Sequence, residues 1–403
     1  MRIFFLLLTL LFMTPSALHA QLDLRGRVID SESGKPLEKA SVFINNTTIG
    51  TVTSAEGKFE LNNLRPGRYE LVISMIEYDM ILESINLNNS SETVLIQLKR
   101  KLTTLKPVII LPEKLRLHYL EIFKRGFIGK TQNASSCKII NPDVLSFDFD
   151  KKTETLRVTA DDFIVVKNDA LGYQVEFLLN QFIFTKNTDL SYLTYYDGQA
   201  LFKSLQGSKA RRNRWTKNRL KAYLGSTMHF FRAAADNKLT ENGFILHTLI
   251  RKKNDQRLAD EILDAKMDRF RKPTATMTKN DNDSLEYWTK KSQLPKEVQF
   301  LLRDTLRHDQ IIFNTEVSGV FVLKFKNYLY VVFANGKNEF KSAYYGTGAN
   351  AIPYSVIDLK EDYALFDQSG ILLNPSSLIF EGYFGDTGGV AGMLPTDYEP
   401  GKQ

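Results

Sequence analysis

Residues 26–44 read GRVIDSESGKPLEKASVFI. The segment holds two short β-prone runs with alternating apolar side chains, and a cluster rich in Asp, Ser, Gly and Pro between them favours a turn. Similar runs and turns continue to about residue 98, with a turn signal roughly every ten residues. This spacing predicts a small antiparallel β-sandwich at the front of the chain.

Individual residues make this prediction more specific. Gly57 and Gly67 stand where turns favour positive φ, and Phe59 and Tyr69 supply aromatic core side chains. The pattern resembles the carboxypeptidase regulatory-like domain, a transthyretin-like, seven-stranded Greek-key sandwich. The residues that carry the resemblance are Gly26-Arg27-Val28-Ile29-Asp30, Gly34-Lys35-Pro36-Leu37, Ala40-Ser41-Val42, Gly50-Thr51, Thr53, Gly57-Lys58-Phe59 and Leu64-Arg65-Pro66-Gly67-Arg68-Tyr69.

The resemblance implies a non-catalytic module for folding, docking or spacing, as found in exported bacterial proteins. This sequence departs from the family at Ile76-Glu77-Tyr78, where the family has a glycine before the aromatic residue. The departure concerns one turn and leaves the expected fold unchanged.

The N-terminus has the three parts of a secretory signal peptide. Arg2 precedes an apolar run from Ile3 to Met13, and small residues up to Ala20 follow Pro15. The run is shorter than the roughly 20 apolar residues of a membrane anchor. We therefore predict an exported protein, periplasmic or associated with the outer membrane of a Gram-negative bacterium, with no transmembrane segment after signal removal.

The bulk properties are those of a globular protein with more than one domain. The chain has 403 residues, 43% of them hydrophobic, and a formal net charge of +7. Outside the cytoplasm this charge favours an envelope protein, an anionic glycan or a lipid as partner, and not nucleic acid. The single cysteine, Cys137, excludes an intrachain disulfide, and we expect it to pack as a small hydrophobic residue.

The predicted domains are a signal peptide (1–20), the β-sandwich (21–99), a linker (100–112) and a larger α+β domain of unknown function (113–403). The fold class is thus mainly β, or α+β, because strands flank one block of helices in the second domain. The expected elements there are a helix with the apolar stripe Leu115, Tyr119, Ile122 and Phe123 that ends at Gly126, strands between 145 and 196, helices within 200–237 and 256–270, an exposed loop at 272–284, and strands between 298 and 380.

Several motifs resemble catalytic signatures, and each has a more ordinary interpretation. His118 and Glu121 form an H-x-x-E pair that could hold zinc with His229, but the flanking residues do not match the metallocarboxypeptidases. The glycine-rich stretch 346–351 precedes β-prone residues instead of the helix that a dinucleotide site needs. Asp386-Thr387-Gly388 lacks the second aspartate of an aspartic protease and is expected to be a loop. We predict no metal site and no cofactor.

The most prominent surface feature is the basic run from Lys203 to Lys221. Arg211, Arg212 and Arg214 stand beside Trp215, and one interpretation is an anion-binding or glycan-binding patch with the indole as a stacking platform. We favour the other interpretation, in which the run is a solvated helix face that Trp215 anchors to the core. Ser226, after Gly225, is expected to cap the next helix.

These observations predict a non-enzymatic exported envelope protein that binds or docks through its sandwich and its α+β domain. The alternatives are a periplasmic hydrolase, zinc peptidase-like or directed at glycans, and a structural subunit of an outer-membrane assembly.

Overall fold

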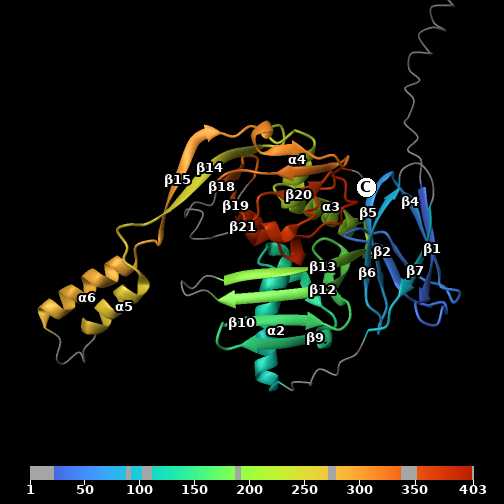
Figure 1. Cartoon of the computed structure of the whole chain (residues 1–403), viewed down its shortest axis with the longest axis horizontal. Coiled ribbons are helices and arrows are strands. Elements are labelled where there is room, and N and C mark those ends of the chain that lie inside the picture. The colour runs from blue at the N-terminus through green and yellow to red at the C-terminus, as the bar shows by residue number, and fades with distance from the viewer. Residues whose placement is uncertain are drawn as a thin grey trace, which may run out of the picture. The chain divides into compact units, whose positions relative to one another are not determined.

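The computed structural model of the chain describes residues 22–87, 92–101, 111–186, 192–270, 278–336 and 352–401. They form two compact units: the described residues up to Ala222 and from Gly389 onward make the first, and Tyr223–Gly388 makes the second. The fold is mainly β, with a smaller number of helices (Figure 1). The predicted signal peptide and most of the predicted linker lie outside the described residues.

The N-terminal part is the predicted β-sandwich. One sheet has the order β4-β1-β7 and the other the order β3-β2-β5-β6, which confirms the seven-stranded arrangement within the described residues. Alternate side chains of both sheets, such as Val28 and Ile73, meet in one core. The strands are β1 (Leu22–Asp30), β2 (Ser41–Ile44), β3 (Gly50–Val52), β4 (Lys58–Leu64), β5 (Gly67–Ser74), β6 (Ile81–Leu87) and β7 (Glu92–Leu98).

Asp30, the last residue of β1, has a buried carboxylate. One oxygen accepts hydrogen bonds from the backbone N–H groups of Glu32 and Ser33, at 2.9 and 2.8 Å. The other accepts from the Tyr78 hydroxyl at 2.8 Å and from Arg100 Nε at 3.2 Å. These donors, the Ser33 N–H first, hold the pKa of Asp30 well below its usual range.

The turn at 76–78 has a backbone conformation that favours glycine, although none of its residues is a glycine. Glu77 has a φ of 69°, in the left-handed region that favours glycine. The next residue, Tyr78, is buried and reaches Asp30, so the turn cannot relax without moving that side chain. The fold therefore tolerates local backbone strain at the position where the sequence departs from the family.

After the two sheets of the sandwich, the first unit contains a six-stranded sheet formed by β8 to β13, which we call the second sheet. Helix α2 (Glu113–Phe127) crosses this sheet (Figure 1). Aromatic side chains of α2 contact the sheet, with Phe123 against Phe182 and Phe127 against Phe177. The long strand β12 pairs with β10 and β11 on one edge and with β13 on the other. The strands are β8 (Cys137–Ile139), β9 (Leu145–Asp150), β10 (Thr155–Ala160), β11 (Ile164–Asn168), β12 (Tyr173–Lys186) and β13 (Tyr192–Ser204).

Helix α2 differs from the prediction in its buried face and its end. The buried side chains are Tyr119, Phe123 and Phe127, whereas Leu115 is exposed. The helix continues through Gly126, where a Cβ atom would lie 2.8 Å from the Phe182 ring. Gly126 thus allows close helix–sheet packing instead of ending the helix.

The sandwich is joined to the second sheet through its loop at 45–48. The N–H of Asn46 donates to the Ala200 carbonyl at 2.8 Å, and the N–H of Phe202 donates to the Thr47 carbonyl at 2.9 Å. The Asn45 side chain also accepts from the Ala200 N–H, at 3.1 Å. Beside these bonds lies a small apolar cluster of Phe43, Val72 and Leu201, with Met80, Phe163 and Leu178 packed against it.

The C-terminal tail, from Gly389 onward, also forms hydrogen bonds with the sandwich loop at 45–48. The N–H of Thr396 donates to the Asn46 carbonyl at 2.6 Å, and Asp397 accepts from both the N–H and the hydroxyl of Thr48. Arg65 pairs with Glu399 at 2.5 Å. The tail and the second sheet both contact the sandwich, and they belong with it to the first compact unit.

The second unit contains the sheet β15-β14-β18-β19-β21 and the sheet β16-β17-β20. Phe230 and Phe231 of helix α4 pack in a core with side chains from both sheets. The strands are β14 (Phe244–Lys253), β15 (Glu297–Thr305), β16 (Ile312–Asn314), β17 (Val320–Leu323), β18 (Tyr328–Phe333), β19 (Tyr354–Leu359), β20 (Ala364–Asp367) and β21 (Leu378–Gly382). The helices outside α2 are α3 (Lys209–Tyr223), α4 (Thr227–Ala235), α5 (Asp260–Phe270), α6 (Lys279–Ser292) and α7 (Tyr383–Thr387), and short 3₁₀ helices occupy Gln132–Ser136, Pro142–Val144, His308–Gln310, Pro375–Ser377 and Val390–Gly392.

Two predictions in this region are wrong and one is confirmed. Of the loop predicted at 272–284, residues 279–284 instead begin helix α6, because Thr278 and Asp281 make a capping box that starts the helix, and residues 272–277 lie outside the described residues. Residues 200–204 belong to strand β13 and not to the basic helical block. Ser226 caps α4 as predicted, with its side chain accepting from the His229 N–H at 3.1 Å.

We expect Asp30→Asn to flatten the acid dependence of stability. A carboxyl group whose pKa is depressed by folding contributes stability above its unfolded-state pKa of about 3.9, and loses it as the pH falls through the folded-state pKa. The variant should therefore be less stable at pH 7 and lose less additional stability between about pH 4.5 and 2.5. Urea denaturation at several pH values measures this, and parallel curves for the two proteins would contradict it.

We expect Glu77→Gly to raise the free energy of unfolding by up to about 1 kcal/mol, because relief of the left-handed backbone outweighs the added entropy of the unfolded chain. The control is Glu83→Gly in β6, which is also exposed. There the same change should lower stability by about 0.5–1 kcal/mol. Thermal or urea unfolding compares the two, and equal destabilisation would argue against strain at Glu77.

Candidate functional site

Helix α3 presents the basic run, and Trp215 fixes it to the first unit. Trp215 is 2% exposed, and its indole Nε1 donates to the Asp169 carbonyl at 2.9 Å. A Cβ atom at Gly172 would lie 2.2 Å from the indole, and one at Gly207 would lie 2.6 Å from it. Two glycines therefore make room for the ring, which leaves it no free face for stacking on a ligand.

Two further side chains of α3, those of Asn218 and Arg219, lie on the same helix face as Trp215 and donate hydrogen bonds to the same turn at 169–172. Asn218 Nδ2 donates to the Ala170 carbonyl, and Arg219 Nε donates to the Leu171 carbonyl, both at 2.8 Å. The Arg219 guanidinium also lies 3.9 Å from the centre of the Tyr173 ring. Positions 215, 218 and 219 are neighbours on one helix face, so this face holds α3 in a fixed rotation.

The remaining cations of α3 are exposed to solvent. Helix α3 contains no Asp or Glu, and its seven cations equal the formal net charge of the whole chain. Arg212 donates a hydrogen bond to the Gly207 carbonyl at 2.8 Å, and Lys221 Nζ donates one to Gln132 Oε1 at 3.5 Å. We call the six exposed cations the basic face: Lys209, Arg211, Arg212, Arg214, Lys217 and Lys221.

Sequence reasoning identified the basic run and Trp215 as its anchor to the core, but it did not identify the two side chains that share this role. Arg219 was counted among the surface cations, but it is partly buried, and burial lowers its pKa. Asn218 was not singled out. The available signal was the Leu171-Gly172-Tyr173 segment, since a glycine between large side chains can mark a close approach by another element.

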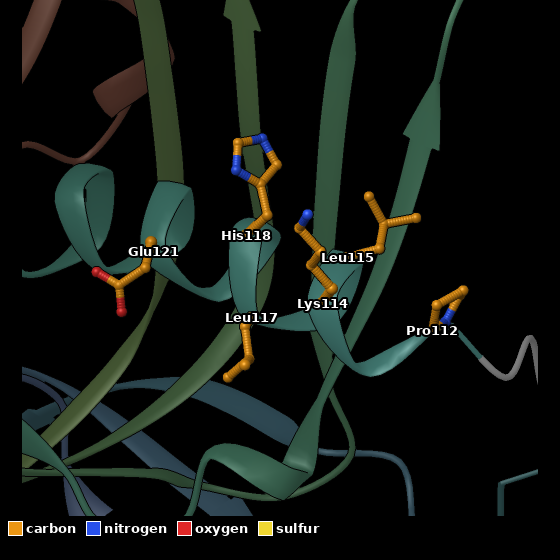
Figure 2. Close-up of a pocket in the computed structure, with 6 residues that line it drawn as sticks. All are labelled: Pro112, Lys114, Leu115, Leu117, His118 and Glu121. Atoms are coloured by element: carbon orange, nitrogen blue, oxygen red, sulfur yellow. The ribbon is translucent and has the colours of Figure 1, made fainter.

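The H-x-x-E pair lies on the outer surface of α2. His118 and Glu121 line a shallow apolar hollow with Pro112, Lys114, Leu115 and Leu117. Figure 2 shows that the imidazole and the carboxylate point in different directions. Glu121 instead accepts a hydrogen bond from Lys124 at 2.8 Å. The pair does not converge on one point where a metal ion could bind.

His229, the third candidate ligand, is buried in the second unit. Its Nδ1 accepts from the Gly225 N–H at 3.1 Å, so the ring proton lies on Nε2, which donates to Asn242 Oδ1 at 3.0 Å. Burial lowers the pKa of the imidazole. Both ring nitrogens are thus engaged in structural hydrogen bonds. Among the described residues, no group of three or more His, Cys, Asp or Glu side chains could hold a metal ion.

The other motifs have structural roles or lie outside the described residues. The glycine-rich stretch 346–351 is not described. Asp386 and Thr387 belong to the short helix α7 instead of the expected loop, and the Thr387 hydroxyl donates to the Tyr383 carbonyl at 2.7 Å. Cys137 is partly buried, and burial raises the pKa of its thiol to about 12, which keeps it protonated.

None of the helices in the described ranges has the length and apolar character that a membrane span requires.

Comparison with known proteins identifies the N-terminal module. Residues 24–110 match the family model of the CarboxypepD_reg-like domain, which confirms the predicted N-terminal domain. No curated protein matches the chain.

Solved structures show only remote similarity. A type II cohesin–X-dockerin complex mutant from Acetivibrio cellulolyticus shares 21% identity over 20% of this chain, with a TM-score of 0.16, and the match spans 58% of that chain. A DUF3823 family protein from Bacteroides ovatus shares 10% identity over 46% of this chain and 100% of its own, with a TM-score of 0.18. A protein of unknown function from Bacteroides fragilis shares 11% identity over 90% of this chain and 93% of its own, with a TM-score of 0.17. Similarity at this level carries no functional inference.

We expect Trp215→Ala to lower the free energy of unfolding by about 3–5 kcal/mol, because it removes a buried indole and leaves a cavity. Arg214→Ala, the exposed neighbour, should change it by less than about 0.5 kcal/mol. Urea denaturation monitored by circular dichroism provides the comparison. Equal stability of the two variants would mean that Trp215 does not anchor α3.

Proposed function

We propose that this protein is a non-enzymatic, exported envelope protein that binds an anionic surface through the basic face of α3. The observation that carries the proposal is a rigidly held helix with six exposed cations and no acidic residue. The N-terminal sandwich serves in this proposal as the docking module that supports the second sheet.

The anchoring of α3 supports binding because it preorganises the charges. The hydrogen bonds of Trp215, Asn218 and Arg219 to the turn at 169–172 fix the rotation of the helix. The basic face then does not lose helix orientation entropy when it meets a partner, although the long side chains still do. Arg211 and Arg214 present planar guanidinium groups, which suit phosphate or carboxylate oxygens.

Three cations of α3, Arg211, Arg214 and Lys217, make no ion pair with a carboxylate of the described residues, and this also supports binding. Elsewhere on the first unit basic and acidic side chains pair, as in Lys203 with Glu176 at 2.5 Å and Lys167 with Asp169 at 3.1 Å. No ion pair with a described carboxylate neutralises Arg211, Arg214 or Lys217 on the basic face. Each such cation near an anionic surface contributes about 1 kcal/mol to association.

The test is binding to vesicles that contain phosphatidylglycerol, compared with vesicles of phosphatidylcholine alone. We expect the wild-type chain to bind the anionic vesicles and to be released by salt. The triple variant Arg211→Ala, Arg214→Ala, Lys217→Ala should lose about 3 kcal/mol, roughly a hundredfold in affinity. Sedimentation of the vesicles measures the bound fraction.

The matched control replaces Lys130, Lys151 and Lys152 by Ala, which are exposed lysines of the same unit. It removes the same charge and should weaken binding far less than the α3 variant. Equal loss in both variants would assign binding to net charge and not to the basic face. No binding by the wild-type chain would contradict the proposal for lipid headgroups, and dextran sulfate then tests a polymeric anion.

A further inference from the structure

Strand β15 forms an edge of the larger sheet in the second unit. The strand order places β15 beside β14, and no described strand lies on its other side. Figure 1 shows β14 and β15 extending from the sheet as a two-stranded ribbon that ends in α5 and α6. An edge strand presents unpaired backbone N–H and C=O groups that can pair with another strand.

The exposed side chains of β15 are unusually apolar for such an edge. Phe300, Leu301 and Leu302 are exposed by 50%, 47% and 43%, although large apolar side chains are normally buried. Residues 298–302 read VQFLL, without the Lys or Pro that commonly protects a free edge. Charges appear only at the ends of the strand, with Glu297 before this run and Arg303 and Asp304 after it.

The ribbon that carries β15 is held in place by its own hydrogen bonds. Asn254, after β14, donates from Nδ2 to the Pro295 carbonyl at 2.9 Å, and its N–H donates to the Lys296 carbonyl at 2.9 Å. Arg257 donates to the Leu294 carbonyl at 2.9 Å. These bonds tie the start of β15 to the end of β14, so the exposed edge is a preformed surface.

We infer that β15 pairs antiparallel with β15 of a second copy of this chain. The register of β15 with β14 is regular from Glu297 to Leu301, and this regular part can pair with itself about Gln299. Val298 of each copy then lies opposite Phe300 of the other. Glu297 lies diagonal to Arg303 of the second copy, a separation that long charged side chains can bridge.

The charge pattern makes this pairing self-complementary. Two-fold symmetry repeats each contact, so one pairing creates two Glu297–Arg303 ion pairs and two Val298–Phe300 apolar contacts. Neither Glu297 nor Arg303 makes an ion pair with another described residue of its own chain. A parallel arrangement would place like charges beside each other, which is unfavourable.

The experiment is sedimentation velocity of the full chain over a range of concentrations, with charge-reversed variants. We expect a weak wild-type dimer, because one strand pair buries less surface than a stable interface. Glu297→Arg and Arg303→Glu should each raise the dimer dissociation constant about tenfold, since each replaces two attractions by two repulsions. The double variant should restore the dimer.

Mixing the two single variants provides the decisive result. A chain with Arg at both positions complements a chain with Glu at both, so the mixture should form heterodimers although neither variant dimerises alone. The matched controls are Glu316→Arg and Lys326→Glu, which change exposed charges of the same unit and should leave dimerisation unchanged. A wild-type chain that stays monomeric, a dimer insensitive to either reversal, or a mixture that does not associate would each overturn the inference.

Discussion

The first unit depends on how the loop at 45–48 satisfies its backbone hydrogen bonds. This loop leaves the sandwich at Asn45 and meets β13, whose Ala200 is fully buried. Buried N–H and C=O groups need partners, and here the loop and β13 supply them to each other. The buried apolar cluster of Phe43, Val72 and Leu201 also joins the sandwich to the second sheet, because Leu201 belongs to β13. A module that the family resemblance describes as a docking domain is thus docked on its own chain.

The same requirement explains the position of α3. The turn at 169–172 exposes carbonyl groups that β12 does not use, and Trp215, Asn218 and Arg219 donate to three of them. Gly172, with a φ of 73°, allows the turn to pass directly against the indole. The anchored face determines which side chains remain outside, so the basic face is a consequence of packing as much as of charge.

Elements with strong local signals were predicted well. The sandwich strands, β12 and the Ser226 cap follow from alternation, turn residues and a capping side chain, all of which act over a few residues. Helix α6 was overlooked because residues 279–292 are polar almost throughout, so the apolar periodicity of a buried helix is weak. β14 was overlooked as well, because its second half is basic and continues into the exposed ribbon.

By itself the sequence determined the seven-stranded sandwich, its family and the presence of a basic helix, because these depend on local patterns. Only the tertiary structure decided that Trp215 anchors α3 and does not serve as a stacking platform for a ligand. The indole packs directly against the backbone of Gly172, which lies 43 positions earlier in the chain. The tertiary structure also decided that the tail from Gly389 belongs with the first unit and that β15 has a free edge. Such outcomes depend on which distant segments meet, and no local pattern of residues encodes that choice.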